Sequence, residues 1–327
     1  MRFGVCIPIG QVEQAAKTGF DYIEPTVVSL QPESPESEIM PLLRILEHAP
    51  LRAEAFNVFL PRDLRVTGPD VDEARQRRYL REAMARVARC GGEVIVFGSA
   101  GARNLPEGFP RERARQQIVE FLLRAAEYAA RHDIVIAIEP LNSAESNIIN
   151  SVQEAAEYAQ AVDHPAVRVL ADFYHIQQAN LPVEDVLHAG RYLAHAHTAD
   201  SGRYAPGTGD WDQGAFLQAL RTIGYDGRVS VECTWRDFDA EAPGAVALLR
   251  QKSSQTLRRF PGPSRPVGQS ALRQSRGQAG ASQDGLNLRR VSYHTDSAIP
   301  PLSTSAPPAS RPVRGSTVMA WTRASPP

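Results

Sequence analysis

Short runs of β-forming residues alternate with helix-forming patterns through the first 251 residues of this 327-residue chain. The eight β-forming runs cover residues 3–9, 21–25, 52–59, 93–98, 134–140, 167–173, 193–197 and 228–233. The helical patterns that follow them cover residues 10–18, 36–48, 70–90, 111–132, 151–162, 183–189, 212–223 and 239–251. Eight strands, each followed by a helix, predict an α/β fold of the (β/α)8 TIM barrel type. A doubly wound sheet is the alternative, but the first run lacks the GxGxxG turn that a nucleotide site there would need.

The composition changes abruptly after Leu249, so we divide the chain into a barrel domain over 1–251 and a tail over 252–327. The tail holds eleven Lys and Arg against two Asp, a charge of +9, with ten of the 25 prolines and thirteen serines. The other 25 basic and 35 acidic residues give the barrel a charge of −10. Because the tail shows no sustained helical or strand period, it cannot bury enough apolar surface to offset its ordering entropy, and we expect it to be disordered. Nucleic-acid binding through its charge and a shift of reading frame stay open as alternatives.

Lysine is almost absent, with two residues against 34 arginines. Lys252 begins the tail, and Lys17 lies in a helical stretch, so neither follows a strand. A Schiff base or a pyridoxal phosphate site needs a positioned lysine amine, and a P-loop needs the pattern GxxxxGK[ST]. We therefore expect none of these three kinds of site.

The three cysteines, Cys6, Cys90 and Cys233, are widely spaced and odd in number, and none lies in a CxxC pair. This pattern argues against a disulfide framework and against a cysteine-based zinc site. It is typical of a protein in the reducing cytoplasm, which is the location we predict. No apolar stretch approaches the roughly 20 residues that span a bilayer, so we expect no membrane partner.

Polar residues follow four consecutive apolar runs, where the chemistry of a barrel is found. These residues are Glu139, Asp172, His197 and Glu232. Because the carboxyl ends of barrel strands meet at one rim, the four side chains are expected to lie together. Carboxylates with one imidazole suit Mn²⁺, Mg²⁺ or Co²⁺ better than a thiolate-preferring metal. The alternative is that these carboxylates cap helices or pair with arginines.

At these positions the sequence resembles the sugar isomerase/epimerase superfamily of xylose isomerase-like barrels, and within it the ketose 3-epimerases and hydroxypyruvate isomerases. The motifs are IEPLN (138–142), DFYH (172–175), HAHTADSGRYAPGTGDW (195–211) and VEC (231–233), with FDYIEP near the second run and FNVFLPRDLRVTGPDVD (56–72). The resemblance covers roughly residues 1–250 and none of the tail.

The resemblance implies roles for seven residues. Glu139, Asp172, His197 and Glu232 match the single divalent metal site of the family, with Zn²⁺ as a further option beside Mn²⁺, Co²⁺ and Mg²⁺. Glu139 and Glu232 also match its acid/base pair of glutamates. His175, Arg203 and Glu145 match substrate-binding residues. We place His195, which alternates with His197, behind the metal site as a packing residue.

The loop after the fourth run departs from the family pattern. Keto-sugar epimerases tend to place an aromatic residue there, whereas this chain has GSAGARNLPEGF (98–109), which argues against a free hexulose. Arg103 is a candidate for binding a substrate carboxylate or phosphate, because its planar fork matches such groups. The alternative is an exposed loop arginine. The endonuclease IV-type members of the superfamily hold three zinc ions, but here Asn57 and Gly98 stand at the ends of the third and fourth runs and cannot complete such a cluster.

We therefore predict a divalent-metal-dependent isomerase or epimerase of a small ketose or sugar-derived hydroxy-keto acid, acting through an enediolate with two glutamates as acid and base. Hydroxypyruvate isomerase, a dehydratase on the same barrel and a non-catalytic sugar-binding barrel remain alternatives. The expected partner is a small-molecule sugar or sugar acid. A nucleic acid is not expected, because the barrel is negatively charged. A homo-oligomer is left open.

Overall fold

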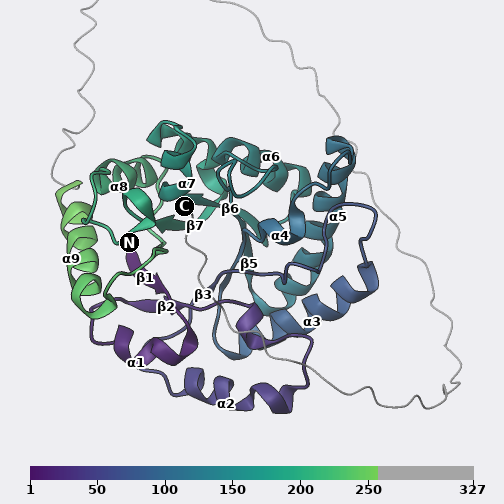
Figure 1. The fold of residues 1–327 in the computed structure, drawn as a ribbon, viewed down its shortest axis with the longest axis horizontal. Helices are drawn as coiled ribbons and strands as arrows, with labels where there is room; N and C mark the ends of the chain where they lie inside the picture. The colour runs from purple at the N-terminus through teal and green to yellow at the C-terminus, as the bar shows by residue number, and fades with distance from the viewer. Residues whose placement is uncertain (257–327) are drawn as a thin grey trace, which may run out of the picture. The chain divides into compact units, whose positions relative to one another are not determined.

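The computed structural model describes residues 1–256, which form a parallel eight-stranded barrel surrounded by helices (Figure 1). The strands are β1 (Arg2–Cys6), β2 (Tyr22–Glu24), β3 (Ala55–Phe56), β4 (Val94–Phe97), β5 (Val135–Ile138), β6 (Val167–Asp172), β7 (Leu193–Thr198) and β8 (Arg228–Val231). Their order in the sheet is β2-β1-β8-β7-β6-β5-β4-β3. Single parallel bridges, Ile23 with Ala53 and Thr26 with Asn57, join β2 to the β3 segment and nearly close the ring. The predicted TIM barrel is confirmed.

Helices follow the strands and form the outer ring in Figure 1. The α-helices are α1 (Val12–Ala15), α2 (Glu36–Glu47), α3 (Glu73–Arg89), α4 (Ala100–Arg103), α5 (Arg111–Ala129), α6 (Val152–Val162), α7 (Phe173–Gln178), α8 (Gln213–Thr222) and α9 (Phe238–Thr256). Short 3₁₀ helices are η1 (Ile9–Gln11), η2 (Val28–Leu30), η3 (Ala130–His132), η4 (Val183–Tyr192) and η5 (Ser201–Arg203). None of the helices within residues 1–256 is long and apolar enough to cross a membrane.

The structure differs from the sequence-based expectation at β3, η4, α4 and α7. The third strand is only Ala55–Phe56, because the chain on either side pairs through single bridges instead of a ladder. The segment predicted as a helix over 183–189 is the 3₁₀ helix η4, which Gly190 interrupts with a non-helical backbone. The sequence pattern did not predict two short helices near strand ends. Helix α7 begins directly after β6, and two residues separate α4 from the end of β4.

Helix α9 continues past the predicted boundary between the barrel and the tail. Helix α9 runs to Thr256, five residues beyond Gln251, and Ser253 on it is buried. Ser253 accepts a hydrogen bond from Arg221 on α8 at 2.8 Å. The predicted disordered tail begins at Lys252, and the prediction is wrong for residues 252–256, which are helical. The rest of the predicted tail, residues 257–327, lies outside the described residues.

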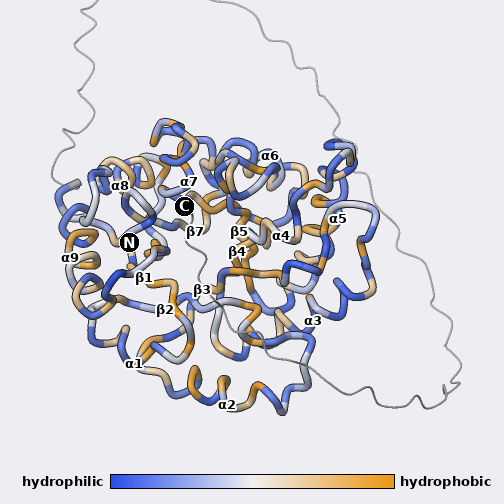
Figure 2. The backbone as a smooth tube through the Cα atoms, in the orientation of Figure 1, coloured by the Kyte–Doolittle hydropathy of each residue, from blue (hydrophilic) through white to orange (hydrophobic). Residues whose placement is uncertain are grey.

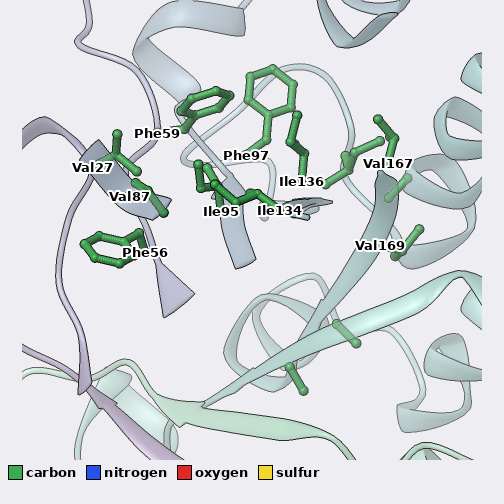
Figure 3. Packing of buried hydrophobic residues seen from close by; sticks show 14 of the residues in the cluster. Val27, Phe56, Phe59, Val87, Ile95, Phe97, Ile134, Ile136, Val167 and Val169 are labelled. Atoms are coloured by element: carbon green, nitrogen blue, oxygen red, sulfur yellow. The ribbon is translucent and has the colours of Figure 1, made fainter. Parts of the chain in front are cut away.

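Each strand buries both of its faces, as a barrel requires. On β4, Val94 and Val96 belong to a small inner cluster, which also contains Tyr22, Ala55, Ala137 and Leu170. The alternate residues Ile95 and Phe97 belong to the larger cluster between sheet and helices (Figure 3). In that layer the Phe97 ring lies 5.4 Å from Phe121 of α5, between ring centroids. Figure 2 shows the apolar colours of β4 and β5 gathered inside a ring of helices that alternate apolar and hydrophilic stretches.

Candidate metal centre and active site

Strand alternation turns a row of polar side chains toward the inside of the barrel. Residues two apart on a strand share a face. Ala137 of β5 and Leu170 of β6 belong to the inner cluster, so Glu139 and Asp172 continue the same face at the carboxyl ends of these strands. His195 and His197 share a face of β7, as Ser230 and Glu232 do at β8. The polar groups therefore form a layer on top of the apolar barrel interior.

The structure brings the four predicted ligand residues together. One ligand atom from each of Glu139, Asp172, His197 and Glu232 lies within 4.8 Å of the others. The Nδ1 atom of His197 lies 3.2 Å from Oε1 of Glu139 and 3.6 Å from Oε2 of Glu232. All four residues come from consecutive strands, and only Glu232 keeps a partly exposed side chain.

Glu24, at the end of β2, contacts the Nε2 side of the His197 ring, opposite the Nδ1 atom that faces Glu139. Its Oε1 lies 2.8 Å from Nε2 of His197, and its Oε2 lies 2.8 Å from Nε2 of His195. Ser230 donates to the same Oε2 at 2.5 Å, and Tyr22 hydrogen-bonds Ser230 at 2.8 Å. Glu24 is fully buried. The sequence analysis missed this residue, although the rule applied to the later strands, a charged residue at a strand end, would have found it.

Cys6 of β1 lies beside this network, and a second group of atoms from Cys6, Glu24 and His197 also falls within 4.8 Å. Burial, reinforced by the Glu24 charge, raises the pKa of the Cys6 thiol well above its usual value. A protonated thiol is a poor metal ligand. The carboxylate-rich group at Glu139 is therefore the better candidate for a divalent cation.

The electrostatics of the centre separate its two glutamates. Burial raises the pKa of Glu139 by more than its hydrogen bond with His197 lowers it. Burial also acts on Glu232, but the His197 hydrogen bond and the charges of His197 and Arg203 outweigh it and lower the pKa to about 2. Burial would lower the pKa of His197, yet the Glu24 charge raises it well above its usual value. Two carboxyl groups with opposite shifts are the arrangement that acid and base roles need.

Two buried polar atoms in the centre have no hydrogen-bond partner among the described residues: Oδ2 of Asp172 and Nε2 of His175. The Oδ1 atom of Asp172 accepts from the Tyr174 backbone and caps α7, which leaves Oδ2 aimed at the centre. Buried polar groups are nearly always paired, so such atoms point to a missing ligand. Carboxylate oxygens with one imidazole are a donor set for Mn²⁺, Mg²⁺, Co²⁺ or Zn²⁺, and the residues present fit such an ion.

His175, in the first turn of α7, has a defined tautomer. The Asn142 backbone N–H donates to its Nδ1 at 3.2 Å, so the neutral ring carries its proton on the unpartnered Nε2. This Nε2 lies 3.8 Å from Oδ2 of Asp172. His175 therefore presents an N–H donor beside the ligand cluster.

Arg203 and Glu145 lie at the mouth of the centre. Arg203 donates to Oε2 of Glu232 at 2.8 Å and to Oε1 of Glu145 at 3.2 Å, and its guanidinium lies 4.8 Å from the Tyr174 ring centroid. Asn142 donates to the same Glu145 oxygen at 3.1 Å. These contacts connect the mouth to the ligand cluster through Glu232.

Arg103 does not lie where the sequence analysis placed it. Its side chain is fully buried and donates to the backbone carbonyls of Phe97 and Glu139 at 2.6 Å each, with its guanidinium over the Phe97 ring. An arginine without exposed surface and with both terminal nitrogens on backbone carbonyls is not placed to bind a substrate anion. The exposed loop alternative is also wrong. Arg103 instead joins the ends of β4 and β5.

Two cavities meet beside the ligand cluster, and Asn57, Val58 and Glu232 line both. The first, of about 530 Å³, extends along Cys6–Gly10 after β1 and has a mainly apolar lining. The second, of about 460 Å³, extends from Glu139 to the loop after β4. Together they give the buried centre access from solvent.

Comparison with known proteins identifies proteins that are similar to this chain. The sequence profile described as xylose isomerase-like TIM barrel matches residues 12–253. A curated relative, the 3-dehydro-D-guloside 4-epimerase of Escherichia coli, is 33% identical over 165 residues, which cover 48% of this chain and 62% of the relative. The probable ketose 3-epimerase of Synechocystis sp. is 31% identical over 74% of this chain and 77% of its own length. Among solved structures, the D-allulose 3-epimerase of Methylomonas sp. in complex with D-allulose matches with a TM-score of 0.67 and 26% identity, over 77% of this chain and 97% of that one.

Proposed function

Because the chain belongs to the xylose isomerase-like TIM barrel family, we propose that it is a divalent-metal-dependent epimerase of a keto sugar or keto sugar acid. Its relatives are epimerases, and the chain is an enzyme of the isomerase and epimerase class. A ketose 3-epimerase and a 3-dehydro sugar 4-epimerase share one chemical problem, inversion at the carbon next to a ketone. That reaction is the activity we propose here.

Glu139, Asp172, His197 and Glu232 would hold the metal, with Mn²⁺, Co²⁺, Mg²⁺ and Zn²⁺ as candidates. When bound, the ion supplies Lewis-acid stabilisation of negative charge on the oxygens of the substrate. The unpartnered Oδ2 of Asp172 and the gathering of four ligand atoms within 4.8 Å support this site. The proposal depends above all on the gathering of the four ligand atoms.

Glu139 and Glu232 would move the proton. One glutamate removes it from the carbon next to the ketone, which leaves an enediolate, and the other returns a proton to the opposite face. General acid–base catalysis of this kind contributes roughly 10²–10⁴-fold in rate. The low pKa of Glu232 favours a carboxylate ready to accept a proton, while the raised pKa of Glu139 favours a proton donor. In the reverse direction the two roles exchange.

His175 and Arg203 would orient the substrate. The Nε2–H of His175 is free to donate to a substrate oxygen beside the metal ligands. Arg203 holds Glu232 and Glu145 in place at the mouth. Donors fixed before the substrate arrives need little reorganisation when charge develops, which lowers the barrier.

Solvent deuterium uptake tests the two-glutamate mechanism. Glu139→Gln and Glu232→Gln each keep an oxygen that can coordinate a metal but remove a base, so turnover should fall by orders of magnitude at saturating Mn²⁺. Each variant should still exchange the proton of one epimer, the one facing the surviving glutamate, and the two variants should prefer opposite epimers. Metal content measured on the same samples separates loss of metal from loss of base.

Three outcomes would replace this mechanism. Near wild-type turnover in both metal-loaded variants would show that Glu139 and Glu232 do not transfer the proton. One dead and one slowed variant would indicate a single-base isomerase of the hydroxypyruvate type. A product lighter by one water would indicate a dehydratase.

We propose the cytoplasm as the location. Cys6, Cys90 and Cys233 are free thiols in the structure. Burial raises the pKa of the Cys6 thiol and raises that of Cys90 to about 11, so both stay protonated and unreactive near neutral pH. This use of cysteine supports a reducing compartment.

A further inference from the structure

The cavity of about 460 Å³ has a side that the proposed mechanism does not use. Glu139, Glu232 and Arg203 line the part next to the ligand cluster. The far part is lined by the segment after β3, up to Arg62, and by Gly98–Gly101 after β4. The segment at 98–101 contains no side chain larger than serine, so the far part stays open to a substrate that extends past its reacting carbon.

Arg62 is an exposed residue that lines this far part of the cavity. Its side chain makes no hydrogen bond or ion pair with any of residues 1–256. The neighbouring arginines are all engaged. Arg65 donates to the carbonyls of Gly101 and Asn104, Arg103 to two carbonyls, and Arg203 to two glutamates. Arg62 is thus a charge with free donors at the cavity wall.

The stem of Arg62 lies against the backbone of the next loop. A Cβ added at Gly101 would lie 2.5 Å from Cγ and 3.0 Å from Nε of Arg62, so the arginine lies directly against the first turn of α4. This contact places the side chain along the wall of the cavity.

A second, independent observation in the same cavity points to a ligand. Asn57 is 6% exposed and donates to Oε1 of Glu232 at 3.3 Å, but its Oδ1 has no partner among the described residues. A buried amide oxygen without a donor is costly unless a ligand supplies one. A hydroxyl on the substrate would be such a donor, so the part of the cavity beside Glu232 is suited to a polar molecule that continues toward Arg62.

We propose that this cavity binds the end of the substrate distant from the ketone, and that this end carries a carboxylate or phosphate held by Arg62. This inference rests on the proposed function and names its substrate class as an anionic keto sugar. A guanidinium with free donors can bind anionic oxygens bidentately. Glu139, Glu145 and Glu232 otherwise leave the cavity lining negatively charged, and Arg203 is already paired with two of them.

Three probes with one carbon skeleton test the proposal: D-fructose, D-fructose 6-phosphate and D-fructuronate. The full-length, Mn²⁺-loaded chain should show a higher kcat/KM for at least one anionic probe than for D-fructose. Arg62→Gln should reduce this preference about tenfold to a hundredfold, mainly through KM, which is the range of one charge-assisted hydrogen bond. Arg62→Lys, which keeps the charge without the fork, should restore part of it. The probe with the larger loss identifies the group as phosphate or carboxylate.

The matched control is Arg81→Gln, which removes an exposed arginine of α3 that pairs with Glu82 and does not line the cavity. It should leave the preference unchanged. An identical preference in wild type and Arg62→Gln would overturn the inference. If none of the probes is epimerised, the proposed function fails for this carbon skeleton. Calorimetric binding of the same probes then tests, independently of turnover, whether Arg62 binds the anionic group. Loss of anion binding in Arg62→Gln supports it, and equal binding overturns it.

Discussion

At the scale of single residues, Glu24 organises a centre whose proposed ligands lie on other strands. Its two oxygens contact His195 and His197, and both rings and the carboxylate are fully buried. A buried carboxylate is costly unless its oxygens are paired, and here both are. Because Glu24 occupies Nε2 of His197, Nδ1 is left facing Glu139 and Glu232. Carboxylates behind a histidine fix the tautomer and ring orientation that a metal ligand needs.

We predict that Glu24→Gln weakens Mn²⁺ binding by about 10- to 100-fold, the usual effect of losing such a carboxylate. The amide keeps the shape but loses the charge that aligns His197. Titration calorimetry with Mn²⁺ measures the affinity without any substrate. Glu54→Gln is the matched control, because Glu54 is equally buried but pairs with Arg2 and Arg228 at the starts of β1 and β8. Unchanged Mn²⁺ affinity in Glu24→Gln would show that the Glu24 charge does not support metal binding by His197.

Arg103 is a second residue whose environment defines its role. Burial lowers its pKa to about 10, so it stays charged at neutral pH. We predict that Arg103→Met destabilises the chain by about 2–4 kcal/mol, because the carbonyls of Phe97 and Glu139 lose their donors. Urea denaturation followed by circular dichroism checks this value. A variant of unchanged stability that binds anionic sugars more weakly would restore the ligand-binding role first expected of Arg103.

At the scale of elements, the loop between β4 and α4 controls the position of Glu139. Gly98 is buried, and a Cβ there would overlap Oε2 of Glu139. Arg103, at the end of α4, donates to the Glu139 carbonyl. The short helix therefore fixes both the backbone and the side chain of a residue on the next strand.

Gly98→Ala should lower kcat at least tenfold by displacing the Glu139 carboxylate, since misplacement by about 1 Å can cost 10²-fold. Gly98 does not have a positive φ, so alanine brings no backbone strain there. Steady-state rates and melting temperature are measured together. Gly244→Ala on α9, where an added Cβ meets nothing within 4 Å, should leave kcat unchanged and keep or slightly raise the melting temperature, because alanine favours a helix interior more than glycine does. A Gly98→Ala variant with wild-type kcat would show that Glu139 can move freely.

At the scale of the whole molecule, the residues that carry the fold and the candidate site lie in 1–256. Helix α9 packs against α8 through the Arg221 to Ser253 hydrogen bond, beyond the domain boundary that the composition suggested. A helix continues while its buried face finds a partner, whereas composition registers only the average over many residues. We therefore choose Thr256 rather than Gln251 as the end of the shortened chain to be tested.

A chain ending at Thr256 should keep the kcat/KM and melting temperature of the full chain. A chain ending at Gln251 should melt about 2–4 °C lower, since loss of roughly 1 kcal/mol shifts a domain of this size by that amount. Differential scanning calorimetry on both chains measures the difference. A large loss of activity or stability in the Thr256 chain would mean that residues 257–327 contribute to the barrel.

The sequence by itself determined the barrel and the gathering of its four proposed ligands. Strand alternation and strand ends are local properties, and a parallel barrel has one geometry that brings Glu139, Asp172, His197 and Glu232 to the same rim. Only the tertiary structure decided which neighbouring side chains reach that rim. Arg103 and Arg62 both lie in segments that follow strands, yet one is buried on backbone carbonyls and the other lines the cavity. Depth of burial and the contact of Glu24 with His197 depend on how distant segments pack, and no local pattern records that packing.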